Sequence, residues 1–316
     1  MKDRISLVGK EAEKFPPHGP TTVTVAICTF RRPSVVQAVE SAVGQRLPAD
    51  LSLHVLVIDS DTTPSAKPLI DQVRAKSSVE ISYHHVPGQN ISIARNAALE
   101  KCSTELLAFL DDDEYAPPDW LESLAAFRQG AQAVFGPSEA LYPEGTPSWL
   151  RLGDFHSNRL DGHETIDTGY TSNVLIDMEF VRRHRLVFDP SLGESGGEDT
   201  MFFRALHRSG GTLRYAPKAV VHEKVVESRL TLAWVRLRRY RAGQVYGLML
   251  HRFDRGAYLR AVSTAPLKVL ACVVMSAPAL FRPGRAPWWL MRGVFHFGVL
   301  SFGLGAKLHR EYQRSL

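Results

Sequence analysis

From residue 21 to residue 110 the chain alternates between short apolar runs and amphipathic stretches. Strands are predicted at residues 21–28, which are rich in β-branched residues, at 79–86, and at 53–58 and 106–110, whose apolar runs are typical of buried strands. The stretches between them predict helices at about residues 34–44, 66–76 and 92–100. This strand–helix alternation, without an internal repeat, predicts a doubly wound α/β domain with a mostly parallel sheet flanked by helices.

The pattern continues less regularly toward the C-terminus. It predicts helices at residues 119–128, 200–208 and 230–250, and strands at 133–142, 169–176 and, as two short strands, 213–222. Residues 143–167 follow no period and are predicted to be irregular. A loop of this length inside a compact domain is usually a binding loop or a lid.

Four carboxylates directly follow the apolar run at residues 106–110, namely Asp111, Asp112, Asp113 and Glu114. Ligands of open α/β sheets bind beyond the carboxyl ends of the strands, where these side chains are expected to lie. Oxygen ligands on a short loop suit Mg²⁺ or Mn²⁺, with a diphosphate completing the coordination shell. The alternative is a solvated acidic turn that caps the helix beginning near Asp119.

Polar residues also follow other predicted strands. Thr29 and Arg31 follow the first strand and Asp59 follows the second, as expected of a nucleotide site along one edge of the sheet. The chain contains neither GxGxxG nor GxxxxGK[ST]. Without such a phosphate-binding glycine loop, a metal held by carboxylates is the remaining way to neutralise a diphosphate.

A second pair of acids, Glu198 and Asp199, follows the glycine-rich stretch at residues 193–197 and begins an amphipathic helix. Acids at a helix N-terminus are favoured by the helix dipole, so a purely structural role is an open alternative to catalysis.

Composition adds a charge asymmetry to this picture. The 316 residues are 44% hydrophobic and 22% charged, which is ordinary for a globular protein with a substantial core. The net charge is +5, yet residues 228–316 alone carry 15 Lys and Arg against two acids, so the rest is acidic. A basic tail on an acidic body favours contact with an anionic surface. Because the tail is also rich in apolar residues, a membrane surface is favoured over nucleic acid.

Two apolar runs lie in this tail, at residues 269–281 and 288–304. The first is short for the roughly 30 Å hydrocarbon core, and the second is interrupted by Arg292 and His296. We therefore expect in-plane, monotopic attachment to a membrane. A transmembrane hairpin and helices packed against the sheet domain are the alternatives.

Three widely separated cysteines, at positions 28, 102 and 272, form no CxxC pair and predict neither a disulfide framework nor a zinc site. Residues 1–20 look like a polar leader, and no signal peptide is visible in them.

Taken together, the motifs resemble the family 2 glycosyltransferases of GT-A fold. The matching stretches, in order from residue 25 to residue 243, are VAICTFRRP, LHVLVIDSD, NISIARNAAL, LLAFLDDDEYAPPDWL, GYTSNVLI, GGEDTMFFRAL and VVHEKVVESRLTLAWVRLRRYRAG. With GDFHS, they are most similar to the glucosyltransferases that extend succinoglycan-type exopolysaccharide repeats on a lipid carrier. The resemblance implies inverting transfer from a nucleotide-activated sugar, with a UDP-sugar as the expected donor and Mg²⁺ or Mn²⁺ as the cofactor.

The resemblance also implies roles for individual residues. Asp199 is expected to be the general base and Glu198 to contact the acceptor, while Asp113 and a further ligand, His222, bind the metal. The expected nucleotide-sugar contacts are Asp59 with the uracil ring, Thr29 and Arg31 near the nucleotide, Arg95 and Asn96 around base and ribose, and Asp111 and Asp112 at ribose and donor sugar. Trp149, Ser172 and Asn173 are candidate sugar contacts, with ordinary packing as the alternative. Asp59-Ser60-Asp61 departs from the family pattern, in which Asn and Ser often follow the acid.

These observations predict a GT-A transferase domain at residues 21–227 and a basic, apolar, helical membrane-associating extension at residues 228–316. The expected reaction moves a hexose, glucose by resemblance, from a UDP-sugar to a lipid-linked oligosaccharide at the cytoplasmic face of the inner membrane. Two alternatives remain open at this point. One is transfer to a lipopolysaccharide core or a lipid phosphate, and the other is a non-catalytic nucleotide-sugar-binding scaffold.

Overall fold

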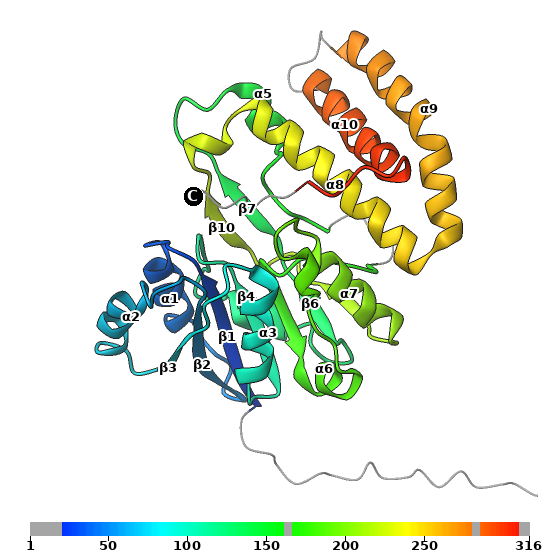
Figure 1. Ribbon diagram of the computed structural model, residues 1–316. Coiled ribbons are helices and arrows are strands. Elements are labelled where there is room, and N and C mark those ends of the chain that lie inside the picture. Colours follow the sequence, from blue (N-terminus) through cyan, green and yellow to red (C-terminus); the bar gives the residue numbers. More distant parts are fainter. Residues whose placement is uncertain (1–20, 161–165, 280–284, 310–316) are drawn as a thin grey trace, which may run out of the picture.

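The computed structural model describes residues 21–160, 166–279 and 285–309, so the expected leader at residues 1–20 lies outside the described part (Figure 1). The first elements are β1 (Thr21–Thr29), α1 (Val35–Val43), β2 (Leu51–Asp59), α2 (Lys67–Arg74), β3 (Glu80–His85), α3 (Ile91–Lys101) and β4 (Leu106–Leu110). This order confirms the predicted strand–helix alternation.

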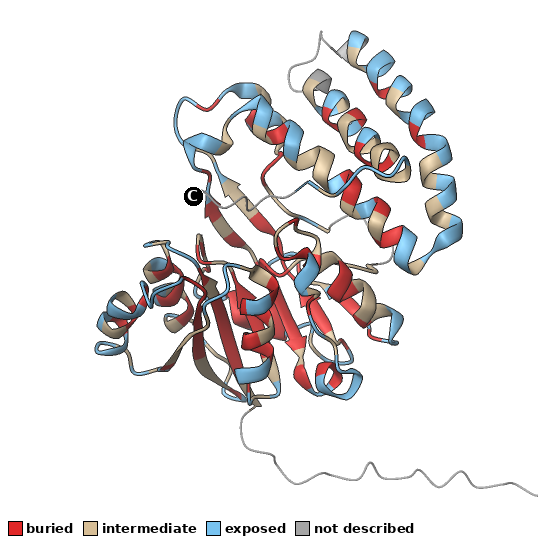
Figure 2. Cartoon of the chain, in the orientation of Figure 1, coloured by how far each residue is buried: buried red, intermediate tan, exposed pale blue. Residues whose placement is uncertain are grey.

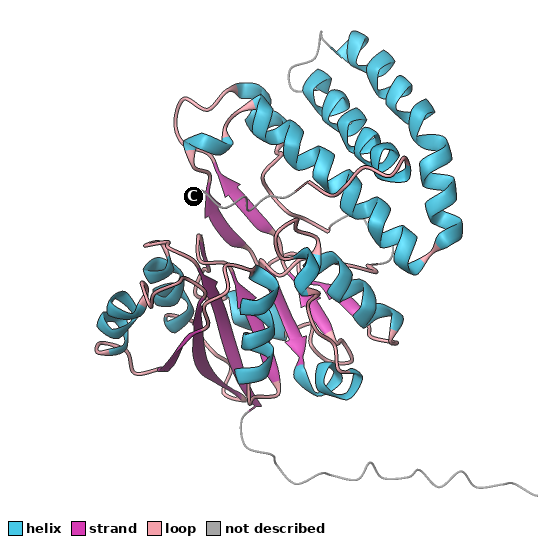
Figure 3. Cartoon of the chain, viewed as in Figure 1, coloured by secondary structure: helices cyan, strands magenta, loops and turns pink. Residues whose placement is uncertain are grey.

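A seven-stranded sheet in the order β3-β2-β1-β4-β8-β6-β9 forms the centre of the fold (Figure 3). β8 (Asn173–Asp177) runs antiparallel to β4 and β6 (Ala133–Phe135), whereas the other pairs, including β6 with β9 (Leu213–Tyr215), are parallel. The sheet is therefore mostly parallel, as predicted. Its central strands are buried on both faces, which is why their sequences are continuous apolar runs (Figure 2).

Helices cover both faces of this sheet. α1, α2 and α4 (Trp120–Ala125) pack on one face, and α3, α6 (Met178–His184) and α7 (Glu198–Arg208) pack on the other. With both faces covered, the open positions for a ligand lie at the carboxyl ends of the strands.

The predicted strand at residues 133–142 is divided between two sheets. β6 ends at Phe135, and β7 (Ser138–Leu141) joins β10 (Val221–Lys224) and β5 (Glu114–Tyr115) in a three-stranded sheet. The break falls at Gly136, where an added Cβ would lie 2.1 Å from the carbonyl oxygen of Ala219. Because β5 follows β4 after only three residues, Asp111 to Asp113, the acidic residues connect the two sheets.

Residues 143–167 are not wholly irregular, because α5 (Ser148–Gly153) lies within them; residues 161–165 are outside the described part. Short 3-10 turns, η1 (Pro190–Leu192) and η2 (Glu227–Arg229), precede α7 and the C-terminal helices.

Three long helices follow, α8 (Leu232–Phe253), α9 (Arg255–Ala279) and α10 (Arg285–Gly303), and we call them the helical extension. Figure 1 shows them side by side, and α10 contacts both α8 and α9. α8 and α10 approach closely at two glycines, since a Cβ on Gly243 or Gly298 would lie 2.0 or 2.1 Å from a carbonyl oxygen of the other helix. Much of α9 is exposed. This helix is therefore not buried against the sheet domain, which was one of the alternatives.

Candidate active site

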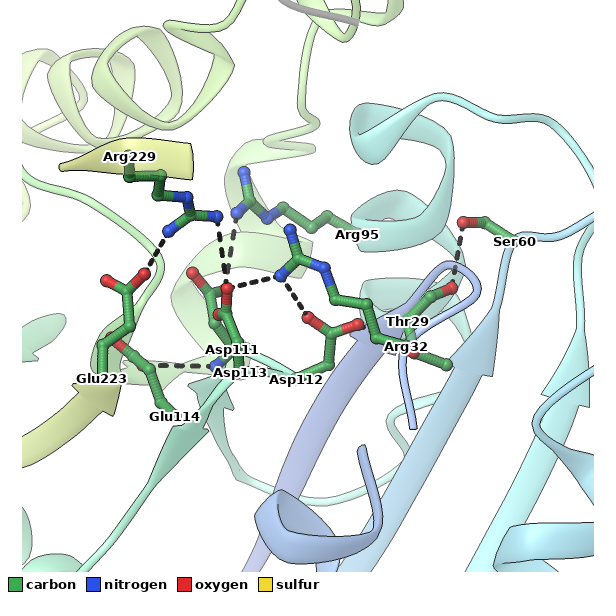
Figure 4. Close-up of polar contacts among 10 residues, drawn as sticks. All are labelled: Thr29, Arg32, Ser60, Arg95, Asp111, Asp112, Asp113, Glu114, Glu223 and Arg229. Atoms are coloured by element: carbon green, nitrogen blue, oxygen red, sulfur yellow. Dashed lines mark hydrogen bonds and ion pairs between the residues drawn. The ribbon is translucent and has the colours of Figure 1, made fainter. Parts of the chain in front are cut away.

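The acidic triplet, Asp111 to Asp113, lies at the carboxyl end of β4, next to the end of β1 (Figure 4). Asp112 is 6% exposed and accepts hydrogen bonds from Thr29 Oγ1 at 2.7 Å and Arg32 Nη1 at 2.9 Å. Burial raises the pKa of Asp112 to about 6, although Arg32 acts in the opposite direction. The strand ends thus bring Thr29 and the triplet together, as the sequence predicted.

Asp113 faces two guanidinium groups. Its Oδ2 lies 2.5 Å from Arg32 Nη1 and 3.4 Å from Arg229 Nη2. Arg229 also forms an ion pair with Glu223, and burial raises the pKa of that glutamate. Sequence reasoning missed Arg32, Arg229 and Glu223. Arg32 is next to Arg31 and Glu223 is next to His222, which the sequence had indicated as site residues. No local feature of the sequence indicates Arg229.

The second pair of acids begins α7. Gly197 precedes it with φ +92°, a left-handed conformation that glycine adopts without strain. Glu198 is 5% exposed and forms an ion pair with Arg95, while its Oε2 makes no hydrogen bond within the described part of the chain. Burial raises the pKa of Glu198 to about 7, against the opposing effect of Arg95.

Arg95 joins the two groups of acids. Its guanidinium pairs with Glu198 and lies 3.8 Å from an oxygen of Asp111. The arginine is 8% exposed, and its guanidinium also lies over the ring of Phe188, 5.8 Å from the centroid. Residues about a hundred positions apart in the sequence therefore meet at Arg95, among several ionisable groups with perturbed pKa values.

Asp199 is half-buried in the first turn of α7. Its Oδ1 accepts a hydrogen bond from the backbone N–H of Thr200 at 2.6 Å. The N-cap residue is Gly197, and it has no side-chain capping bond. A helix-capping role alone therefore does not account for both acids, because Glu198 is committed to Arg95 instead.

Asp59 and Asn96 bind other parts of the chain. The Asp59 carboxylate is fully buried and accepts hydrogen bonds from Asp61 N, Ala66 N and Tyr83 Oη. Asn96 holds both the N–H and the carbonyl group of Phe188. In this conformation both side chains brace loops around the site, so a direct contact of either with a nucleotide rests on the family resemblance.

Arg31 lies at the edge of the same strand-end region. Its backbone has φ 55°, and its Nε donates to Asp61 Oδ1 at 2.8 Å. The pair links the loops that follow β1 and β2, where the resemblance places the nucleotide.

His222 does not face the triplet. Successive side chains of a strand point to opposite faces, and it is Glu223 that reaches Arg229 and, through it, Asp113. The His222 ring packs against Tyr115 at 5.2 Å between centroids, and its Nδ1 is buried without a hydrogen-bond partner among the described residues. The role of His222 as a metal ligand therefore stays a prediction, and Glu223 is the residue of this strand that contacts Arg229.

The candidate sugar contacts separate into two kinds. Trp149 in α5 packs against Phe155, 5.9 Å between ring centroids, and Asn173 bonds with Trp120 and two backbone carbonyls, so both have packing roles. Ser172 is 7% exposed, and its hydroxyl makes no hydrogen bond within the described residues. It precedes Asn173, which pairs with Leu110 beside the triplet. Ser172 thus stays a candidate.

The carboxylates of Asp113 and Glu223, beside Arg229, would be the ligands of a divalent cation in this region. Oxygens of Asp113 and Glu223 both contact this guanidinium, so two hard donors already converge on one positive group. Among the described residues, no three His, Cys, Asp or Glu side chains are arranged to hold a metal by themselves. The donor set suits an ion whose shell is completed by a diphosphate.

The fold and the two converging groups of acids define a GT-A glycosyltransferase. The model of Glycosyl transferase family 2 matches residues 24–186, and the chain belongs to this family. It is 40% identical over 297 residues to the succinoglycan biosynthesis protein ExoM of Rhizobium meliloti (strain 1021), covering 92% of this chain and 95% of that relative.

Solved structures at low identity share the fold. The mannosyltransferase PcManGT of Pyrobaculum calidifontis, in complex with GDP-Man and Mn²⁺, matches with a TM-score of 0.62 at 17% identity, covering 94% of this chain and 92% of that one. S. aureus TarS 1–349 in complex with UDP-GlcNAc matches with a TM-score of 0.55 at 15% identity, covering 90% and 92%. The chain spans 52% of a longer TarS structure.

Proposed function

We propose that this family 2 glycosyltransferase moves a hexose, with glucose as the first candidate, from a UDP-sugar to a lipid-linked saccharide in exopolysaccharide synthesis. The observation that carries the proposal is Arg95, which contacts the triplet at Asp111 and the second acid pair at Glu198. Donor-side and acceptor-side acids then flank one sugar. The similarity to a succinoglycan biosynthesis protein over nearly the whole chain supports the pathway class.

In the proposed reaction, Asp199 removes the proton from the acceptor hydroxyl as its oxygen attacks the anomeric carbon, and configuration inverts. Such general-base assistance contributes about 10²–10⁴-fold. Glu198, held by Arg95, contacts the acceptor beside it. A cation held by Asp113 and Glu223 would supply Lewis-acid stabilisation of the departing diphosphate. Arg32 and Arg229, which contact Asp113, lie where they can neutralise the same charge.

The nucleotide is proposed to lie along the ends of β1 and β2. Thr29, Arg31, Asp111 and Asp112 border this region, and Ser172 lies beside the triplet for contact with the donor sugar. Asp59 and Asn96 support the loops through the internal bonds described above.

We further propose that residues 21–227 form the transferase domain and that the helical extension attaches to a membrane at its cytoplasmic face. α9 has one stretch, Arg255–Ala277, that is long and apolar enough to cross a membrane by length and composition, and little of it is buried. Its exposed face includes Leu259, Leu267, Leu270 and Val274. Apolar side chains flanked by Arg260 and Lys268 fit an anionic bilayer surface.

In-plane attachment is the arrangement that suits the packing. α9 lies against α10, and α10 lies against α8, so a spanning α9 would take α8 into the bilayer with it. α8 carries several arginines, which are costly at the bilayer centre.

A donor screen tests the function. Labelled UDP-sugars are incubated with the protein and with membranes as the acceptor source, and the lipid fraction is extracted. We expect label from one UDP-hexose on lipid-linked saccharide, and loss of this transfer in excess EDTA. Label on lipid phosphate or lipopolysaccharide core would favour the alternative acceptors, and donor binding without release of UDP would favour a scaffold.

A further inference from the structure

Arginines of the helical extension line the side of α8 that faces the rest of the protein. Arg241 Nη2 donates to the Ser195 carbonyl at 2.8 Å, and Arg238 Nη2 donates to Asn158 Oδ1 at 3.4 Å. Just before the helix, Arg229 pairs with Glu223 and Asp113. Each of these cations has a protein acceptor.

Arg239 differs from them. It is half-buried, and no hydrogen bond or ion pair joins it to any residue in the described ranges. Its guanidinium lies over the ring of Phe155, 5.6 Å from the centroid, and Phe155 is 3% exposed. Burial, reinforced by the neighbouring charge of Arg238, lowers the pKa of Arg239, and the opposing effects of Asp154, which forms no ion pair with it among the described residues, and of Tyr142 are smaller. A partly desolvated cation without an anion is costly, and a bound anion would remove that cost.

The surroundings of Arg239 are apolar. Leu150 and Phe155 at α5, Val235 of α8 and Met291 of α10 form one buried cluster, with Trp149 packed against it. Next to Met291, the guanidinium of Arg292 lies over the rings of Trp288 and Trp289 at 5.2 and 5.8 Å. Tryptophan and arginine together are typical of the boundary between a bilayer and water. Arg239 therefore lies among the helices proposed to meet the membrane.

A continuous series of side chains connects this region to the catalytic acids. Arg229 and Arg238 both lie over the ring of Trp234, at 5.8 and 5.1 Å from its centroid. His156 stacks on the same ring at 4.9 Å, and its Nε2 lies 3.0 Å from the Arg229 carbonyl oxygen. Since a carbonyl only accepts, His156 must donate there. This contact fixes Arg229 between Asp113 and the start of α8.

We propose that Arg239, with Arg238 beside it, forms the subsite for the phosphate group of a lipid-linked acceptor, whose saccharide then extends past Trp234 to the catalytic acids. This subsite rests on the proposed function in that its ligand is the glycosyl acceptor. The anion supplies the hydrogen-bond acceptor that Arg239 lacks among the described residues. The apolar cluster and the tryptophans of α10 receive the first part of the lipid chain.

Two acceptors with the same saccharide test the subsite, one linked to a lipid diphosphate and one to a neutral alkyl chain. Loss of a charge-assisted contact in Arg239→Gln should raise the ratio of the KM for the charged acceptor to the KM for the neutral one by roughly 10-fold to 100-fold. Arg239→Lys should restore part of the ratio. Arg236→Gln, an exposed arginine of the same helix, should leave the ratio unchanged. An unchanged ratio in Arg239→Gln would overturn the proposal.

A binding measurement separates this proposal from the function on which it rests. Farnesyl diphosphate and farnesol are titrated into wild type and Arg239→Gln in detergent, and we expect the variant to lose its preference for the diphosphate. This readout decides the subsite even if wild type transfers sugar to neither acceptor. Equal affinities of wild type and variant for the diphosphate would overturn it. The proposal would also be overturned if Arg239→Gln reduced binding to phosphatidylglycerol vesicles as much as binding to the diphosphate. That result would assign Arg239 to the bilayer surface.

Discussion

The transferase part and the helical extension distribute charged and apolar groups in opposite ways. Around the triplet, Asp112, Glu114 and Glu198 are at most 6% exposed, and their pKa values are raised chiefly by burial. In α9 and α10, by contrast, Leu267 is 69% exposed and Phe297 is 51% exposed. Buried charge is costly, and so is an extended apolar surface in water, so each feature indicates a ligand. In the proposed function, the ligand of the first region is an anionic sugar donor, and that of the second is a lipid surface.

α8 belongs to both regions. Arg229, just before it, reaches Asp113, and its middle holds the loop before the second acid pair through Arg241. Val245 packs at Gly197, where an added Cβ would lie 2.6 Å from Val245 Cγ1. The surface that we assign to the membrane is thus joined by one helix to both groups of acids in the candidate active site.

The largest effect is expected in the transferase part. Asp199→Asn should lower kcat by about 10²–10⁴-fold, because the amide cannot accept the proton of the attacking hydroxyl. Affinity for the UDP-sugar, measured by titration, should stay close to wild type. Asp119→Asn is the matched control, since this aspartate is exposed and its side chain caps nothing. A kcat for Asp199→Asn near that of the control would assign the base to another residue.

The next effect concerns the extension. Leu267→Glu combined with Leu270→Glu should weaken sedimentation with anionic vesicles by roughly 100-fold, because a fully buried leucine contributes about 1.5–3 kcal/mol. The two side chains are 69% and 60% exposed. Val187→Glu alters an apolar residue that is 65% exposed in the transferase part and should leave vesicle binding unchanged. If all three proteins sediment alike, this face of α9 does not meet the bilayer.

The pH dependence of stability tests the buried charge itself. The pKa of Glu198 is raised from 4.5 to about 7, so between these values the folded state binds more protons than the unfolded chain. Raising the pH through this window should therefore destabilise wild type, by up to about 3 kcal/mol relative to Glu198→Gln. Denaturant unfolding of both proteins at several pH values measures the difference. Parallel stability curves would show that Glu198 is not protonated on folding.

The smallest effect concerns the crossing of α8 and α10. Gly298→Ala places a Cβ against the backbone of Tyr240 and should cost about 1–3 kcal/mol through overpacking. Gly256→Ala, at an exposed position of α9 with ordinary contact distances, should be neutral or slightly stabilising. Thermal unfolding, with limited proteolysis of α8 to α10, compares the two variants. Equal unfolding temperatures would mean that the helices adjust their separation freely.

Much of this molecule follows from its sequence because the relevant signals are local. Apolar runs such as residues 106–110 predict strands, and an acidic triplet directly after one of them must lie at the carboxyl edge of the sheet. The glycines before Glu198 likewise indicate the start of α7. These predictions depend on residues close together in the chain.

Only the tertiary structure decides which distant residues meet. Arg229 reaches Asp113 across 116 positions, and strand alternation in β10 directs Glu223 rather than His222 toward the triplet. The packing of α5 against α8 and α10 places Trp149 against a buried cluster and leaves Arg239 without an ion-pair partner among the described residues. Strand register and long-range packing determine these contacts, and the periodicity of hydrophobic residues along the chain predicts neither.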